Sequence, residues 1–332
     1  MKSPFSLVRR GVHNPGKVPS YLGRKLSSAT RRGREELFRR KYSIPRQKPR
    51  VTEFVDQDEF TLVILDSCRY DMFAAAYADF LGGDLSAVWS SGRWTGEYIH
   101  NMWDRYHDLT YVNAAPVVSD FYFENRASGP NPEQYFREVI PVWEGGWDDD
   151  LGTTPAEEVT ETALRVAADS DHPRLVVHYI QPHFPYVGDY RPDALEGGYA
   201  HIRERADADG DRMTDQWIAR VESGDLTNAE IRRAYKSNLE YVLSEVQRLI
   251  RALDCPIVVT ADHGEHLGEG GRYLHEESSK YTRTVPWFRV ESVVGESETN
   301  PLDEVQRSDG ENESSVDDDV VEERLADLGY IE

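Results

Sequence analysis

The chain has 332 residues, of which 39% are hydrophobic and 30% are charged, and its net charge is −22. This composition suits one large α/β domain or two average ones, and it argues against collagen-like, fully disordered and membrane-spanning proteins. Residues 1 to 50 hold 15 Lys or Arg and two Glu, a net +13, which leaves −35 on the rest. So acidic a body is typical of halophilic proteins and argues against specific nucleic-acid binding; an acidic protein from an ordinary cell is the alternative.

The first predicted segment is this basic N-terminal arm, residues 1 to 50. Leu22, Leu26 and Ala29 recur at helical spacing among arginines. The pattern predicts either a thin amphipathic helix on an anionic membrane surface or a flexible arm that folds back on the acidic body, which is favoured. No apolar run approaches the roughly 20 residues of a membrane span, and no secretory signal is visible. The expected location is therefore cytoplasmic, free or peripheral at the inner membrane surface through residues 1 to 50.

Residues 51 to 294 are predicted to form one domain in which strands and helices alternate. Buried strands are predicted at 60 to 65, 175 to 180, 256 to 260 and 286 to 290, and helices at 69 to 81, 155 to 168 and 228 to 253. Thr153 or Thr154 is the expected cap of the second helix. This alternation predicts an α/β fold with a mostly parallel sheet between helical layers.

Two further segments interrupt or follow this pattern. Residues 190 to 227 are polar and acidic, and they are predicted to form an inserted loop or cap. Residues 295 to 332 form an acidic tail, predicted to be disordered over 295 to 322. Residues 321 to 331 regain apolar spacing, so the end of the tail is expected to dock on the domain.

Reactive residues follow three of the predicted strands. Asp66 follows the first, His183 lies just after the second, and Asp262 and His263 follow the third, with Gly264 behind them for a tight turn. In an open α/β sheet, ligands bind beyond the carboxyl ends of the strands. Two carboxylates and an imidazole give the oxygen and nitrogen donors that suit Zn, Mn or Mg. The sequence thus predicts a metal centre at this edge.

The ordered motifs resemble the alkaline phosphatase superfamily, and within it the sulfatase-like branch. The matching segments are residues 62 to 71, 182 to 186 and 258 to 269, His275, and the terminal residues 324 to 331. The resemblance implies an alkaline-phosphatase-like core and a divalent metal held by Asp66, Asp262 and His263. The ion would be Zn, Mn, Mg or Ca, with one ion favoured and two left open.

The resemblance also implies the catalytic residues. The family's nucleophile lies on a loop that here spans residues 89 to 97, where Thr95 is the candidate nucleophile. Ser90 and Ser91 are its rivals, and an ordinary helix cap is the structural alternative for Thr95. His183 and His275 match the family's later histidines, which assist the leaving group or bind a second metal.

The remaining assignments are less specific. Arg93 and Arg69 are candidates for binding a phosphate or sulfate group, and an ion pair with Asp71 is the alternative for Arg69. His178 is expected to lie in the core, and His266 in a loop. The residues that select the substrate are expected on loops at 100 to 150 and 190 to 227.

One departure from the family bears on the reaction. Formylglycine sulfatases carry a Cys or Ser four residues before an Arg, whereas here Trp89 stands four residues before Arg93. Cys68 is followed two residues later by Tyr70, where the motif has Pro or Ala. The favoured function is therefore metal-dependent hydrolysis or transfer of a phosphate ester through Thr95, on a small-molecule, glycan-linked or lipid-linked substrate. A sulfuric ester hydrolase without formylglycine and a catalytically silent sulfatase-like binding protein are the alternatives.

Overall fold

A computed structural model describes residues 33–125, 134–169, 173–192, 213–275, 277–295, 301, 316–328 and 330. The predicted amphipathic segment around Leu22, Leu26 and Ala29 lies outside the described residues. So do residues 193–212 of the predicted insertion and most of the acidic stretch between 296 and 315.

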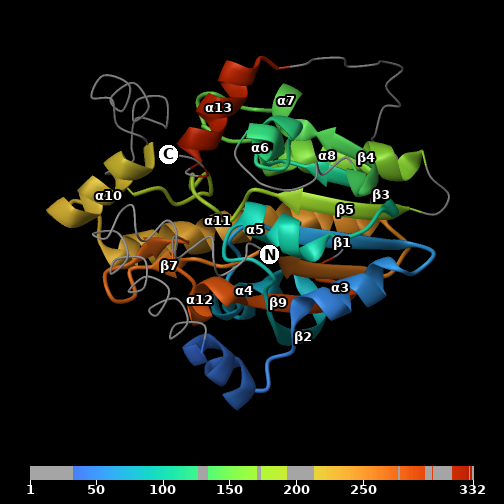
Figure 1. The fold of residues 1–332 in the computed structure, drawn as a ribbon, viewed down its shortest axis with the longest axis horizontal. Coiled ribbons are helices and arrows are strands. Elements are labelled where there is room, and N and C mark those ends of the chain that lie inside the picture. The colour runs from blue at the N-terminus through green and yellow to red at the C-terminus, as the bar shows by residue number, and fades with distance from the viewer. Residues whose placement is uncertain are drawn as a thin grey trace, which may run out of the picture.

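A seven-stranded sheet with strand order β2-β9-β6-β1-β5-β3-β4 forms the centre of the fold (Figure 1). Its strands are β1 (Phe60–Leu65), β2 (Leu81–Trp89), β3 (His107–Asn113), β4 (Phe136–Pro141), β5 (Arg174–Tyr179), β6 (Ile257–Ala261) and β9 (Thr284–Val293). The central strand β1 is buried along its whole length and pairs in parallel with β5 and β6. Strand β9 is antiparallel to β6 and β2, so the predicted α/β fold with a mostly parallel sheet is confirmed.

Helices cover both faces of this sheet. In β9, Trp287 contacts Phe54 of α3 (Gln47–Val55), and the next residue, Phe288, contacts Phe73 of α4 (Tyr70–Ala76). Successive strand residues point to opposite faces, so α3 and α4 lie on opposite sides. Helix α11 (Asn228–Ala252) packs on both α4 and α8 (Ala156–Ala168), and α5 (Thr95–Met102) lies beside α3 (Figure 1).

Shorter elements complete the described chain. They are a helix at 33–41, the turn η2 (Tyr77–Asp79), α6 (Asp120–Asn125), α7 (Val142–Gly145), α10 (Met213–Ser223), α12 (Lys280–Arg283) and α13 (Asp318–Asp327). A small antiparallel ribbon pairs β7 (His266–Leu267) with β8 (Tyr273–Leu274). His266 is therefore a buried ribbon residue, and its expected place in a loop is wrong.

The long helix α11 shows why the sequence pattern succeeds. Thr227 and Glu230 form a capping box at its N-terminus, which satisfies backbone donors that the helix leaves free. The apolar residues at three- and four-residue steps are all buried: Ile231, Tyr235, Leu239, Val242, Val246 and Leu249. The predicted helix at 228 to 253 is confirmed to within one residue.

Several local predictions are wrong. Helix α4 ends at Ala76 and Leu81 begins β2, so the helix expected to reach residue 81 is shorter. Helix α8 has Pro155 at its N-cap without a side-chain cap, and Thr154 donates to the Ala114 carbonyl oxygen instead. The region from 100 to 150 holds β3, α6, β4 and α7 rather than loops alone. Helix α13 starts at Asp318, inside the stretch predicted to be disordered.

At both ends the folded body includes residues beyond the predicted bounds of the domain, from the basic arm and from the acidic tail. Residue 50 lies inside α3, and Gln47 is buried with its side-chain amide donating to Thr260 Oγ1 and to the Ala261 carbonyl oxygen. The last residues of the basic arm thus belong to the body. In the tail, the buried side chains of Leu325 and Leu328 confirm the expected docking.

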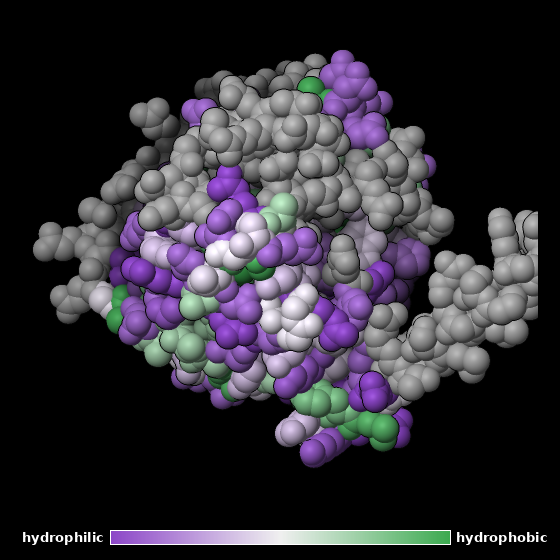
Figure 2. All heavy atoms as spheres, turned by 90° about the vertical axis from the view of Figure 1, so that its left-hand side faces the viewer, coloured by the Kyte–Doolittle hydropathy of each residue, from purple (hydrophilic) through white to green (hydrophobic). Residues whose placement is uncertain are grey.

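The surface seen in Figure 2 is mostly hydrophilic, with an apolar patch at its lower edge, at the height of the helix 33–41 in Figure 1. Leu37 of this helix is 70% exposed, and Tyr42 after it is 57% exposed. In the described part of the chain, no helix is both long enough and apolar enough to cross a membrane.

Candidate functional site

The topology brings the three predicted strand ends together. Because β6, β1 and β5 are adjacent and parallel, their carboxyl ends meet at one edge of the sheet. Asp66 follows β1, Asp262 and His263 follow β6, and His183 lies four residues after β5. All four side chains are fully buried. The fifth contributor, Thr95, begins α5 and is buried as well.

Thr95 lies at the middle of this group. Its hydroxyl donates to Asp66 Oδ2 at 3.1 Å, and its Oγ1 lies 3.3 Å from His263 Nε2. His263 Nε2 in turn lies 3.3 Å from Asp66 Oδ1 and 3.3 Å from Asp262 Oδ2. Trp94 rather than Thr95 is the N-cap of α5, so the Thr95 side chain faces the carboxylates and does not cap the helix.

Local hydrogen bonds aim the ligand atoms of Asp262 and His263 inward. Asp262 Oδ1 accepts from the backbone N–H of Ser67 at 3.2 Å and of His263 at 2.7 Å, which leaves Oδ2 for the centre. Ser67 holds a φ of 60°, a conformation that non-glycine residues rarely adopt and that points its N–H at Asp262. His263 Nδ1 lies 3.0 Å from the Gly264 carbonyl oxygen, so Nε2 is the free ring atom.

The donor atoms present fit a divalent cation. Among the described residues, Asp66 Oδ1, Asp262 Oδ2 and His178 Nε2 are buried without a hydrogen-bond partner. Ligand atoms of these three residues lie within 4.8 Å of one another. Buried polar atoms normally have partners, and a cation between two carboxylates would satisfy all three.

The pKa shifts of the buried groups also favour a cation in the centre. Burial opposes ionisation of Asp66, but the neighbouring histidines, His263 foremost, hold its pKa well below the ordinary value. Burial and the Asp66 charge raise the pKa of Asp262 to about 7. Burial would lower the pKa of His263, but the two carboxylates outweigh it and raise this pKa to about 9. A positive charge is thus favoured between the two carboxylates, and a metal ion would supply it in place of the proton on His263.

His183 and His275 form a pair beside this centre. Their Nε2 atoms lie 3.3 Å apart, and His183 Nδ1 contacts the carbonyl oxygen of Phe184. The ring centroid of His275 lies 4.8 Å from that of His263, which places the pair against the buried centre. Burial lowers the pKa of both histidines, and the nearby imidazoles lower that of His275 further.

The two arginine candidates lie in different settings. The guanidinium of Arg69 is held by Asp71 and Glu269 and is 4% exposed, so the structure gives it the ion pair that was the alternative to substrate binding. Arg93 lies 3.5 Å from Glu97 with 39% of its side chain exposed. Arg93 is therefore more exposed than Arg69 and pairs with a partly exposed carboxylate, so it stays the candidate for binding the substrate anion.

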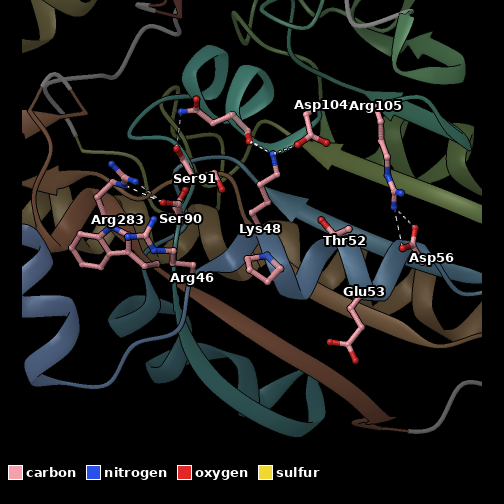
Figure 3. Close-up of a pocket in the computed structure, with 13 residues that line it drawn as sticks. Arg46, Lys48, Thr52, Glu53, Asp56, Ser90, Ser91, Asp104, Arg105 and Arg283 are labelled. Carbon is pink, nitrogen blue, oxygen red and sulfur yellow. Dashed lines mark hydrogen bonds and ion pairs between the residues drawn. The ribbon is translucent and has the colours of Figure 1, made fainter.

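The rival nucleophiles lie on the loop before Thr95 but face elsewhere. The Ser90 hydroxyl donates to the backbone carbonyls of Gly92 and Asp262, so it supports the loop. Ser91 lines a surface cavity of about 950 Å³ (Figure 3). This cavity is bordered by α3 and by the end of α5, and it contains none of the side chains of the buried centre. Its Lys48 is paired with Asp104 at 2.7 Å.

Sequence reasoning missed three residues of this region. His178, placed in the core, does lie there, but its Nε2 is 3.9 Å from Asp262 Oδ2. A polar residue near the carboxyl end of a buried strand was the available signal. Glu265 is fully buried, neither carboxylate oxygen has a partner among the described residues, and burial raises its pKa to about 8. Tyr330 donates a hydrogen bond to Asp66 Oδ2 from the far end of the chain, and nothing in the sequence assigns it a role.

Fold and centre together define an α/β enzyme-like protein with a buried hydroxyl, two carboxylates and several histidines at the carboxyl edge of its sheet. A family model described as Sulfatase matches residues 92–288, more than half of the chain. The chain therefore belongs to the sulfatase family, which confirms the predicted sulfatase-like branch of the alkaline phosphatase superfamily.

Solved structures with similar folds are distant in sequence. The soluble domain of lipooligosaccharide phosphoethanolamine transferase A from Neisseria meningitidis has 15% identity and a TM-score of 0.44, over 69% of this chain and 75% of that one. Phosphonate monoester hydrolase of Agrobacterium radiobacter has 17% identity and a TM-score of 0.41, over 70% and 68%. The periplasmic domain of EcEptC from Escherichia coli, in complex with Zn, has 12% identity and a TM-score of 0.41, over 71% and 74%. No curated protein matches the chain significantly in sequence.

Proposed function

We propose that this protein is a metal-dependent hydrolase or transferase of phosphate esters, with Thr95 as its nucleophile. One observation carries the proposal: Thr95 Oγ1 lies 3.1 Å from Asp66 Oδ2 and 3.3 Å from His263 Nε2, inside a buried group of partnerless acidic oxygens. Thr95 is also the first residue of α5, where free backbone N–H groups favour an anion.

Asp66 and Asp262 would hold the metal together with one imidazole. His263 is the predicted third ligand, with Nε2 3.3 Å from both carboxylates, and His178, whose ligand atom lies within 4.8 Å of theirs, is the alternative. A divalent ion bound there would lower the pKa of the Thr95 hydroxyl and offset the negative charge of the ester. One ion is favoured, because two carboxylates and one imidazole supply three protein ligands and leave a position open for the Thr95 oxygen or the ester.

The reaction then follows from the positions of the protein's own groups. Thr95 Oγ1 gives its proton to Asp66 Oδ2, the oxygen that accepts its hydrogen bond, and forms a bond to phosphorus as the bond from phosphorus to the ester oxygen breaks, which leaves a phosphothreonine. The Nδ1–H of His183 donates to the Phe184 carbonyl oxygen, so His183 Nε2 is an acceptor and the Nε2–H of His275 is the group that would donate a hydrogen bond to the departing oxygen. Water or an acceptor alcohol then takes the phosphoryl group from Thr95, and the identity of this acceptor decides between hydrolase and transferase.

Sulfate ester hydrolysis is the second candidate, and membership of the sulfatase family favours it. The same residues would serve a sulfuryl group, without formylglycine. Cys68 is fully buried, and burial raises the pKa of its thiol well above the ordinary value. Trp89 occupies the position of a convertible residue relative to Arg93.

The substrate class and the location of the protein are further proposals. The substrate is a small-molecule, glycan-linked or lipid-linked ester, and the protein works in the cytoplasm, with its basic arm able to contact the inner membrane surface. The exposed side chains of Leu37 and Tyr42, beside the exposed Arg40 and Lys41, support that contact.

The test is a turnover screen of metal-loaded protein against p-nitrophenyl phosphate, phosphonate and sulfate esters, with Thr95→Ala and Ser91→Ala compared. We expect one ester class to be turned over, Thr95→Ala to lose at least about a thousandfold in rate, and Ser91→Ala to keep it. A protein that binds the metal but turns over none of these esters is the silent binding protein, and the proposed catalysis then fails.

A further inference from the structure

Tyr330 places a phenol in the middle of the candidate active site. Its hydroxyl donates a hydrogen bond to Asp66 Oδ2, the same oxygen to which the Thr95 hydroxyl donates. Its ring stacks on His183, with centroids 5.6 Å apart and planes at 22°, and on His275, at 6.3 Å and 26°. One side chain thus contacts Asp66 and both candidate leaving-group histidines, and it shares its acceptor with Thr95.

The C-terminal segment that carries Tyr330 is anchored on the body of the protein. Helix α13 buries Leu325 and Leu328, and the Tyr330 N–H donates to the Leu325 carbonyl oxygen at 2.9 Å. Arg324 donates to the Trp143 carbonyl oxygen at 2.6 Å, and its guanidinium lies 5.0 Å from the Trp147 ring. The tyrosine reaches the centre from this anchored helix, and the contact joins residues 264 positions apart in the chain.

The phenol fills the space that a substrate needs. An ester attacked by Thr95 must bring its reacting atom to about 3–3.5 Å from Oγ1. The Tyr330 hydroxyl bonds the carboxylate oxygen that Thr95 faces, its ring lies against both histidines, and Thr95 and His183 are 0% exposed. Tyr330 and His275, at 8% and 9% exposed, are the members of this group that reach the surface.

We propose that Tyr330 is an internal ligand of the active site, which occupies the place of the ester oxygen and leaving group, so that the C-terminal segment must withdraw before a substrate binds. The identity of the displacing ligand as an oxyanion ester rests on the proposed function. The occlusion itself rests only on the contacts of Tyr330.

The contacts of Tyr330 indicate that its side chain occupies the place of a substrate and does more than orient Asp66. The Tyr330 hydroxyl is the donor in its hydrogen bond to Asp66 Oδ2, since a carboxylate oxygen accepts. A tyrosine that served only to orient Asp66 would need no contact beyond this hydrogen bond. The ring, however, also stacks on the two histidines that face the leaving group, and a bound substrate would have to displace it.

The first measurement is the affinity of the metal-loaded, full-length protein for vanadate, a mimic of the phosphoryl centre. A site that is open in only a tenth of the molecules binds about tenfold more weakly than an open one. We therefore expect Tyr330→Ala to lower the Kd for vanadate about tenfold or more. Tyr330→Phe keeps the ring and loses the hydrogen bond, so its Kd should fall by a smaller factor.

The second measurement needs no ligand and no turnover. Diethyl pyrocarbonate modifies accessible histidines, and mass spectrometry locates the modified residue. We expect His275 and His183 to react about tenfold faster in Tyr330→Ala than in the wild type. Tyr273→Phe is the matched control, since it removes a tyrosine hydrogen bond to Asn228 (2.8 Å) away from the centre. This control should change neither the labelling rate nor the Kd.

Each result supports or overturns the proposed occlusion by Tyr330. A Kd for vanadate that rises or stays constant in Tyr330→Ala overturns the proposal, because the tyrosine would then be a supporting part of the site or a bystander. Unchanged labelling of both histidines overturns it too. Faster labelling without vanadate binding in either protein upholds the occlusion and counts against the proposed function. If Tyr330→Ala does not fold, the vanadate titration is made with Tyr330→Phe, whose ring preserves the packing but lacks the hydrogen bond to Asp66, and a Kd equal to that of the wild type overturns the proposal.

Discussion

Replacing Arg69 by methionine should destabilise the fold while leaving anion binding unchanged. The substitution keeps most of the side-chain stem and removes the guanidinium. In the structure, Nε and Nη2 donate to the two carboxylate oxygens of Asp71 at 2.9 and 2.6 Å, and Nη1 donates to Glu269 Oε1 at 2.7 Å. Only 4% of the Arg69 side chain is exposed, so the fold encloses a cation that two carboxylates hold.

The size of the effect follows from the exposure of the partners. Asp71 is 59% exposed, so its pair with Arg69 contributes less than about 1 kcal/mol. Glu269 is 16% exposed, and a hydrogen bond to a charged group in such a place contributes about 1.5–3 kcal/mol. Without Arg69, Glu269 still accepts from the Leu267 N–H at 2.7 Å and from Arg232 at 3.3 Å. It is therefore not left unpaired, and we expect a loss of about 2–4 kcal/mol in the free energy of unfolding.

The loss in the free energy of unfolding caused by Arg69→Met should shrink as the pH falls. Burial would raise the pKa of Glu269, but the hydrogen bond from Arg69 outweighs it and holds this pKa below the ordinary value of 4.5. A carboxylate with a depressed folded-state pKa stabilises the fold above its unfolded-state pKa and loses that contribution as the pH falls through the folded value. The difference between wild type and Arg69→Met should thus be full at pH 7 and shrink below about pH 4.5.

Urea unfolding followed by circular dichroism at neutral and acidic pH measures these differences, and vanadate titration measures anion binding. Arg272→Met is the control, because Arg272 is 55% exposed in its pair with Glu277 and its loss should change stability by no more than about 0.5 kcal/mol. An Arg69→Met protein of unchanged stability with tenfold weaker vanadate binding would show that Arg69 serves the substrate, against the reading of the structure.

Three further results are expected. An Asp262→Ala, His263→Ala double variant should lose the divalent metal that the purified wild type retains, and metal content equal to that of the wild type would refute the assigned centre. Phosphate or sulfate trapped on the protein during turnover should map by mass spectrometry to Thr95 and be absent from Thr95→Ala; label on Ser91 would show that another hydroxyl attacks. Leu37→Asp should weaken co-sedimentation with anionic vesicles about fivefold or more without changing turnover of a soluble ester, since burying a leucine contributes about 1.5–3 kcal/mol, and equal sedimentation would exclude this helix from membrane contact.

The central strands and the polar residues at their carboxyl ends could be predicted because each depends on local sequence. An unbroken apolar run at 60 to 65 identifies a strand buried on both faces, and the polar residue that follows it must lie at the sheet edge. The same reasoning applies to Asp262 and His263 after β6. Thr95 depended on a family resemblance, because a single hydroxyl on a loop has no local pattern.

The outer strands could not be predicted for a physical reason. Strand β2 lies at the edge of the sheet, and its middle residues are partly exposed, so its sequence lacks a continuous apolar run. Strand β4, at the other edge, has only one fully buried residue. Such strands are fixed by pairing with a neighbour far away in the sequence, and propensity alone does not show that pairing.

Gly264 is required at its position, but the reason differs from the tight turn that the sequence suggested. A glycine after Asp262 and His263 suggests a turn that needs conformational freedom, yet Gly264 does not adopt a positive φ. A Cβ at this position would instead lie 2.3 Å from the carbonyl oxygen of Tyr281. Glycine is required because another segment of backbone passes against it, and its N–H donates to the Thr282 carbonyl oxygen at 2.9 Å. This contact joins the segment of Asp262 and His263 to α12, the helix that leads into β9.

The centre itself does not stabilise the metal-free fold. Two buried carboxylates repel each other, and Asp66 Oδ1 and Asp262 Oδ2 lack hydrogen-bond partners in the described part of the chain, so the surrounding structure must hold both side chains in place. Backbone donors from Ser67 and His263 hold Asp262, with the strained φ of Ser67 as part of that arrangement, and the Thr95 hydroxyl donates to Asp66. The hydrogen bond from Tyr330 offsets some of the Asp66 charge while the site is closed. An ester that displaces Tyr330 therefore has to replace that hydrogen bond, which links opening of the tail to the charge of the ligand that enters.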